Sequence, residues 1–275
     1  MNYKRDLEQT YLTTSCLEKH NITPALRARM VDWMIEVLTN FKCDDQTFFA
    51  SVSLLDRYLK NQPDCQEISD LHLMGVTSMY VGSKYEDIQP LKIKMVYEKI
   101  AHKKLSMDSI RQMELKILKA INYKISAPSV LDFLKVYLKD VLNIGHLGNT
   151  SLSKEEKENL PKESDTPAGE SLLIQKMSLY LAKMSMHDYE LAGRKPSLVA
   201  VGAFYVALKI CEQLKKKTLI FADLVKRMQD ISQCSEEEII EISQKVLYLA
   251  QNFDKAFPGL ENLKKTHFVV ITQLL

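Results

Sequence analysis

Helical periodicity runs through nearly the whole chain of 275 residues, and it limits the possible folds more than any other feature. Apolar residues recur at intervals of three and four, and no stretch shows a convincing two-residue alternation. Only eight glycines and eight prolines interrupt the pattern. The sequence therefore predicts an all-α protein. We expect a first helix over residues 3–19, followed by two sets of about five helices.

The segment RARMVDWMIEVLTNF, residues 27–41, predicts a helix that is buried on most sides. Its apolar residues cover nearly every direction around the helix axis, whereas a surface helix usually carries one apolar stripe. Arg27, Asp32 and Glu36 nevertheless lie among them. Thr23 is the expected N-cap and Pro24 the expected first-turn residue. The pattern alone leaves open which groups these charges contact.

Two later segments, residues 71–87 and 196–213, combine small residues with a largely apolar helix pattern. Small side chains let neighbouring helices approach closely, so each segment is interpreted as the centre of a helical domain. Between the two domains, residues 143–170 are rich in Gly, Ser, Pro, Lys and Glu and predict a mobile insertion. The small residues of the two helix segments 71–87 and 196–213 are Gly75, Ser78, Gly82, Ala200, Gly202, Ala203 and Ala207.

Composition argues against several classes of protein. A net charge of +2 gives no large electrostatic footprint for nucleic acid. The N-terminus has no apolar signal core, and the longest apolar run, Leu198 to Leu208, is too short to span a bilayer. Five scattered cysteines without a CxxC pair favour reduced, buried thiols in a cytosolic or nuclear protein.

No motif of catalysis is present. The sequence lacks GxGxxG, Walker, HExxH and GxSxG patterns, and its six histidines do not cluster. Cys16 and His20 lie one helical turn apart but have no further ligands nearby, so a buried thiol and a surface imidazole are favoured over a metal site. Glu86 and Asp87 are interpreted as a charge pair at a helix end. We predict no active site, no cofactor and no metal.

Several motifs resemble those of one family, in order and at its spacing. LRARMVDWMIEV resembles the signature MRAILVDWLVEV that opens the cyclin box, and SLLDRYL, LMGVTSMYVGSKYEDIQP and RQMELKILKAINYKISAPSVLDFL resemble the segments that follow it. MHDYELAGRKPSLVAVGAFYVALKI resembles the second box of A- and B-type (G2/mitotic) cyclins. The resemblance implies an N-terminal helix in residues 1–21, five-helix cyclin boxes in 22–126 and 127–255, and a C-terminal extension in 256–275.

This resemblance also implies a function. The chain is expected to be a non-catalytic regulatory subunit that binds and activates a cyclin-dependent serine/threonine kinase, in the nucleus and cytoplasm, during cell division. Arg27 is expected to form a buried structural ion pair with Asp56, although Asp32 is an alternative partner. The expected kinase-binding residues are Lys84, Glu114, Tyr85, Leu118, Tyr123, Ile125, Leu7 and Tyr11.

Many cyclins of this type also carry an apolar groove that captures Arg-x-Leu motifs of substrates and inhibitors. Arg29 occupies a position that is apolar in the family signature, His72 replaces a usual glutamine, and Ile68 and Ser69 fall where a basic residue is expected. Because Arg29 competes with a ligand arginine for Glu36 and repels it, we expect weak or altered docking, with acidic or apolar motifs preferred. An Arg29 that simply faces solvent is the alternative. The matching groove residues are Leu26, Met30, Trp33, Glu36, Leu71 and His72.

Two other functions remain as alternatives. One is a non-activating interaction platform, against which the intact Lys84 and Glu114 argue weakly. The other is a nucleic-acid-binding module of the same fold, as in transcription initiation. That module should carry a basic recognition helix in its second box, whereas this chain has the acidic stretch SEEEIIEI there.

Overall fold

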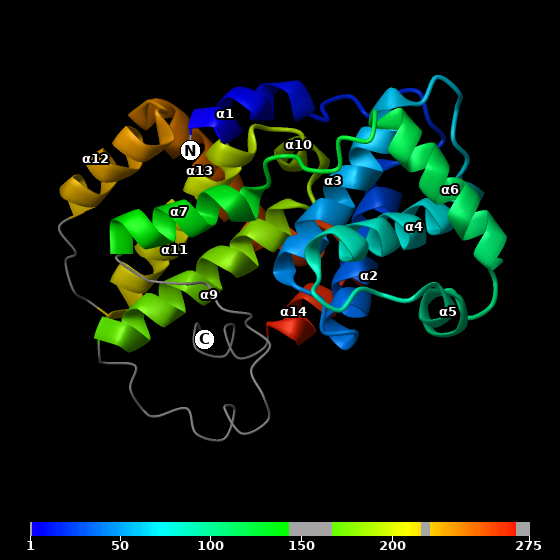
Figure 1. Ribbon diagram of the computed structural model, residues 1–275. Coiled ribbons are helices and arrows are strands. Elements are labelled where there is room, and N and C mark those ends of the chain that lie inside the picture. The colour runs from blue at the N-terminus through cyan, green and yellow to red at the C-terminus, as the bar shows by residue number, and fades with distance from the viewer. Residues whose placement is uncertain (1, 143–166, 216–220, 268–275) are drawn as a thin grey trace. The chain divides into compact units, whose positions relative to one another are not determined.

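The computed structural model describes residues 2–142, 167–215 and 221–267, and within these ranges every regular element is a helix (Figure 1). The chain forms two compact units. The first contains the chain up to Ser129 together with Met186–Lys195 and Phe257–Thr266. The second contains Val130–Ser185 and Pro196–Ala256. The all-α prediction is confirmed.

Helix α4 (Ile68–Glu86) is the central helix of the first unit. It contacts helices on several sides, and a Cβ atom on Gly82 would lie 2.7 Å from Ser51 Oγ of α3. The small residues of this segment therefore allow the close approach that the sequence predicted. The other elements of the unit are α1 (Asn2–Glu8), η1 (Gln9–Tyr11), α2 (Pro24–Asn40), α3 (Asp45–Asn61), α5 (Ile93–Met95), η2 (Val96–Ile100), α6 (Met107–Ala120), α10 (Tyr189–Ala192) and α14 (Asn262–Thr266).

Side-chain caps fix where the main helices of this unit begin. Thr23 Oγ1 accepts a hydrogen bond from Leu26 N (3.3 Å) at the start of α2, which places Pro24 at the first helical position. Ser106 Oγ accepts one from Ser109 N (3.0 Å) at the start of α6. Both side chains satisfy amide groups that have no partner within the helix.

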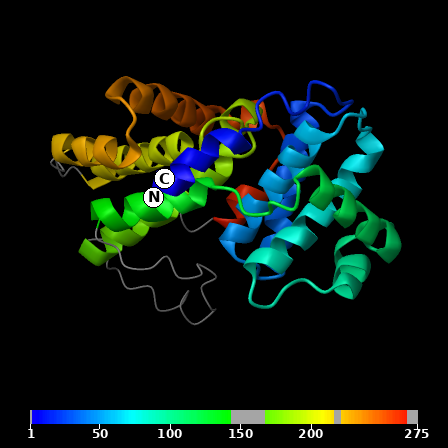
Figure 2. The ribbon, with the colours of Figure 1, turned by 45° about the horizontal axis from the view of Figure 1, so that its top comes forward.

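In the second unit, α11 (Pro196–Lys215) is the central helix and contacts all four others (Figure 2). A Cβ atom on Gly202 would lie 2.8 Å from Ile242 Cγ2 of α13, so this position requires glycine for the observed approach. The surrounding helices are α7 (Val130–Leu142), α9 (Pro167–Ser185), α12 (Phe221–Ser232) and α13 (Glu236–Ala256).

The structure corrects the expected first helix. A helix over residues 3–19 is wrong, because regular helix ends at Tyr11 and residues 12–23 form turns and extended chain. Leu12 is extended and Ser15 has a left-handed φ of 65°, which no α-helix accommodates.

The apolar pattern of residues 172–192 predicts one helix, but the structure divides this segment into two. Helix α9 begins at Pro167 and ends at Ser185, and a separate turn, α10, follows. The break lies where Asp188 caps α10 by accepting a hydrogen bond from Leu191 N (2.8 Å). Residues 143–166 of the predicted insertion lie outside the described residues.

The five cysteines are all free thiols. Cys16 and Cys211 are buried, as expected, whereas Cys65 is exposed.

Candidate functional site

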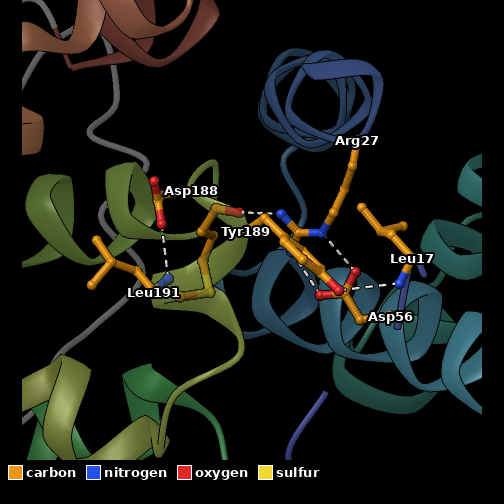
Figure 3. A network of polar contacts seen from close by, with 7 residues as sticks. Leu17, Arg27, Asp56, Asp188, Tyr189 and Leu191 are labelled. Carbon is orange, nitrogen blue, oxygen red and sulfur yellow. Dashed lines mark hydrogen bonds and ion pairs between the residues drawn. The ribbon is translucent and has the colours of Figure 1, made fainter. Parts of the chain in front are cut away.

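The charged residues of α2 are fixed by buried partners. Arg27 and Asp56 are both buried and form a two-bond ion pair, Nε to Oδ1 at 2.7 Å and Nη2 to Oδ2 at 2.6 Å (Figure 3). Arg27 Nη1 also donates a hydrogen bond to Met186 O (2.8 Å). Burial alone would lower the pKa of Arg27, but the Asp56 carboxylate outweighs this effect and raises it. Arg27 is therefore charged and joins three segments of the first unit.

Asp32, the alternative partner of Arg27, has a different environment. Its Oδ1 lies 3.3 Å from His187 Nε2, and its carboxylate accepts hydrogen bonds from the amides of Asn262 and Leu263 (both 3.2 Å). Burial opposes the charged form, yet these hydrogen bonds and His187 together lower the pKa of Asp32. The open question from the sequence is thus answered, since Asp56 pairs with Arg27 and Asp32 caps α14.

Lys84 and Glu114 are brought together at the surface, where the end of α4 passes the middle of α6. They form a salt bridge with each other. The Lys84 ammonium also lies 4.2 Å from the centroid of the Tyr80 ring, within the range of a cation–π contact. The two groups therefore sit at one place on the surface.

The other residues expected to bind a kinase are apolar or aromatic, and two of them are exposed. Tyr85 and Tyr123 are 49% and 63% exposed, and the remaining expected residues are half-buried. Exposed aromatic groups beside a charged pair are a feature of protein-binding surfaces. The half-buried members of the expected kinase-binding set are Leu118, Ile125, Leu7 and Tyr11.

Sequence reasoning missed two further apolar residues, Ile88 and Leu115, which are 99% and 53% exposed. Leu115 lies off the buried stripe of α6, which Ile110, Met113 and Ile117 form, and this offset could have been found by periodicity. Ile88 follows the last turn of α4 in a segment without periodicity, so its exposure was not visible in the sequence.

The turn that carries Ile88 is held by Asp87. Asp87 Oδ1 accepts hydrogen bonds from Asp44 N (2.8 Å) and Thr47 Oγ1 (2.7 Å), and Oδ2 accepts one from Ser83 Oγ (2.6 Å). These bonds tie the turn to α3 and α4. Ile88 is thus presented to solvent from a fixed backbone.

The expected docking residues lie on neighbouring parts of α2 and α4. The rings of Trp33 and His72 contact each other, with centroids 5.3 Å apart. Met30 and Leu71 are buried, Leu26 is half-buried, and Glu36 is exposed.

Of the two effects expected from Arg29, repulsion of a ligand arginine and competition for Glu36, the structure does not support the competition. Arg29 is exposed. Among the residues that the structure describes, no ion pair joins Arg29 to Glu36. Lys265 of α14 has a raised pKa, mainly through Glu261, with a further contribution from Glu36. Burial, together with Lys104 and His102, lowers the pKa of His72.

The Cys16 and His20 pair has other contacts. His20 Nε2 lies 2.8 Å from Leu59 O, and His20 Nδ1 accepts a hydrogen bond from Gln66 N (3.1 Å). Both ring nitrogens therefore have protein partners, and burial raises the pKa of the Cys16 thiol. In the parts of the chain that the structure describes, no group of three His, Cys, Asp or Glu side chains could hold a metal ion, and no helix is long and apolar enough to cross a membrane.

Comparison with known proteins gives consistent matches over both units. Residues 1–126 match the family model "Cyclin, N-terminal domain", and residues 128–258 match "Cyclin, C-terminal domain". A G2/mitotic-specific cyclin-B1 of Anguilla japonica is 30% identical over 209 residues, 76% of this chain and 44% of the relative. That of Xenopus laevis is 27% identical over 259 residues, 94% of this chain and 55% of the relative.

The chain thus spans about half the length of the curated relatives that it matches. Among solved structures, a viral cyclin from herpesvirus saimiri has the same fold, with a TM-score of 0.67 and 18% sequence identity. This match covers 90% of the present chain and 96% of the viral chain.

Proposed function

Because the chain belongs to the cyclin family, we propose that it binds and activates a cyclin-dependent serine/threonine kinase. Phosphoryl transfer by a protein kinase requires an ion pair between a lysine of its third strand and a glutamate of its C-helix. A rigid surface that binds the C-helix only in its inward position selects the active arrangement. The chain supplies that surface, and the kinase supplies the chemistry.

The observation that carries this proposal is the exposed cluster around Lys84 and Glu114. The salt bridge between α4 and α6 provides one donor group and one acceptor group for backbone atoms of a partner. Exposed apolar area is provided by Tyr85 and Ile88, which follow Lys84 in the sequence, and by Tyr123, which follows α6. An apolar patch gives affinity, and a few charges fix the register of binding.

Substrate docking is a second part of the proposal. Trp33 and His72 form an aromatic contact, and Met30 and Leu71 on the same two helices are buried, which supports a site for an apolar anchor. Arg29 is exposed on the same helix as Trp33 and does not pair with Glu36, so it acts on a cationic ligand by repulsion and not by competition for that carboxylate. Docking of Arg-x-Leu segments is therefore weak.

The two alternatives have less support. A nucleic-acid-binding module needs a basic helix, but the first turn of α13 carries Glu236, Glu237 and Glu238. The intact pair of Lys84 and Glu114 argues only weakly against a non-activating platform. The activity test below separates this platform from an activator.

The test combines capture with activity. Purified chain, immobilised on beads, is incubated with extract from dividing cells, and bound kinase is identified and assayed on histone. We expect capture of a cyclin-dependent kinase and an increase in its activity by orders of magnitude over the free kinase, with no phosphotransfer by the chain alone. Capture without activation would indicate the platform, and intrinsic phosphotransfer would refute the proposal.

A further inference from the structure

The C-terminal end of α3 contacts two segments that are far apart in the sequence. Arg57 is 4% exposed, and its Nη1 and Nη2 donate hydrogen bonds to the carbonyl oxygens of Ile125 (3.2 Å) and Lys124 (2.5 Å). On its other side, Arg57 Cζ lies 4.6 Å from the centroid of the Tyr11 ring. One guanidinium thus joins the N-terminal segment to the chain that follows α6.

Two neighbours on α3 extend the same arrangement. Lys60 Nζ donates to Leu12 O (2.5 Å), and Asn61 Nδ2 donates to Ala120 O (2.9 Å). Positions 57, 60 and 61 share one face of a helix because they are three and four residues apart. This face, which we call the α3 clamp (Arg57, Lys60, Asn61), binds the N-terminal segment and the end of α6 together.

The segment beyond α6 needs such support. Asn122 and Tyr123 have left-handed φ values of 51° and 56°, a conformation that is common for Asn but unfavourable for Tyr. Tyr123 N donates to Leu118 O (2.8 Å), which closes the turn and leaves the Tyr123 side chain exposed. Arg57 then binds the next two carbonyl groups, so the direction of the chain after the turn depends on it.

We propose that Arg57 is a positioning residue that holds two edges of the kinase-binding surface in register, the Tyr11 edge and the Tyr123–Ile125 edge. The inference rests on the proposed function for its purpose, but its structural part is independent of it. A planar guanidinium presents several donors in a fixed fork and also stacks on an aromatic ring. A lysine ammonium is a compact charge and lacks this fork, so Arg57→Lys does not restore the arrangement.

The first test is hydrogen exchange of the free chain, resolved by segment. Arg57→Met should raise amide exchange by about tenfold both in residues 9–14 and in residues 120–126, since it removes hydrogen bonds from a charged donor. Lys60→Met should affect only the first segment, and Asn61→Ala only the second. The matched control is Arg111→Met, on the exposed part of α6, which should affect neither.

The second test is a double-mutant cycle on affinity for a purified cyclin-dependent kinase phosphorylated on its activation loop. Arg57→Met and Tyr11→Ala should each weaken binding by about tenfold, and the double variant should be no weaker than the weaker single one, because both changes release the same edge. Lys94→Ala, which removes an exposed pair outside the expected kinase-binding residues, is the control and should bind as the unaltered chain does.

The outcomes separate the two proposals. If the unaltered chain binds no such kinase, the proposed function fails, and the exchange data still decide whether the clamp exists. If folded Arg57→Met leaves exchange in both segments unchanged, or if its effect adds fully to that of Tyr11→Ala, the inference is overturned. Should Arg57→Met not fold, Lys60→Met and Asn61→Ala, whose altered side chains are exposed, decide instead through their separate segments.

Discussion

Lys84 and Glu114, the two charged residues expected to contact a kinase, form a salt bridge with each other between α4 and α6. The Lys84 and Glu114 side chains are 36% and 17% exposed, so water screens much of their attraction. The salt bridge therefore adds little to stability. The salt bridge holds both groups at one place on the surface. We expect each group to form a hydrogen bond with the kinase there.

Lys84→Ala and Glu114→Ala should each weaken kinase binding by ~2–5 kcal/mol, because the kinase loses a charged hydrogen bond at a desolvated interface. The thermal unfolding of the free chain should change little. Calorimetric titration and thermal scans check these outcomes. Lys94→Ala, which removes a solvent-exposed pair with Glu98, is the matched control and should bind normally. Unfolding of either variant, or unchanged affinity, would contradict the assignment.

Arg27→Ala should lower the free energy of unfolding by ~3–5 kcal/mol, because it leaves the buried Asp56 carboxylate without its partner. Kinase binding should fall with it. Arg29→Ala, two residues along the same helix but exposed, should change stability by only ~0.5 kcal/mol. Urea unfolding of both variants provides the measurement. Equal stability of the two would mean that the buried pair does not have the role assigned to it.

Ile88→Ser should weaken kinase binding by ~1–3 kcal/mol, since it removes an apolar group that binding would bury. The fold should be unaffected, because the residue is 99% exposed and Asp87 holds the turn. Ile68→Ser, at the opposite end of α4 and 54% exposed, is the control and should leave affinity unchanged. A similar loss of affinity in both variants would instead indicate a non-specific effect of surface polarity.

Asp32 should make stability fall in acid. Its folded-state pKa lies below the ordinary value of 3.8, so the unfolded chain takes up a proton first as the pH falls. The stabilisation is fully present above that value and is lost as the pH falls through the folded-state pKa. Asp32→Asn removes the titrating group. The variant should therefore lose less free energy of unfolding between about pH 5 and pH 3 than the unaltered chain does. Parallel pH profiles for the two chains, measured by urea unfolding, would rule out this role.

A generic Arg-x-Leu peptide should bind weakly to the Trp33 surface, because Arg29 repels the ligand arginine. Arg29→Ile should strengthen binding several-fold, by ~1 kcal/mol or more, if that repulsion is the cause. Calorimetric titration of both chains with the same peptide gives the comparison. Low-micromolar binding that Arg29→Ile does not improve would defeat the idea.

Local signals made much of the fold predictable. Thr23 and Ser106 are capping residues at the starts of α2 and α6, and each acts through a contact three residues away. The small residues of α4 and α11 identified the central helices, because close packing of helices requires small side chains and the sequence shows these directly. By contrast, nothing in the periodicity of residues 3–19 showed that the chain leaves the helix after Tyr11.

The contacts of the candidate site were less visible in the sequence. Resemblance suggested Asp56 for Arg27, but the partners of Asp32 lie 155 and more than 200 residues away along the chain. No local pattern encodes such contacts. Likewise, the salt bridge between Lys84 and Glu114 depends on how α4 crosses α6, which periodicity does not specify.

The polar partners of α2 have a consequence for how the protein is made. Arg27 donates to Met186, and Asp32 binds His187 and the amides of Asn262 and Leu263, so the buried charges of an early helix have acceptors and donors in late parts of the chain. During synthesis, residues 1–129 of the first unit emerge from the ribosome long before these partners exist. A fragment ending at Ser129 would keep two buried charges with incomplete partners. We therefore expect chaperones to retain the growing chain until residue 266 has been translated.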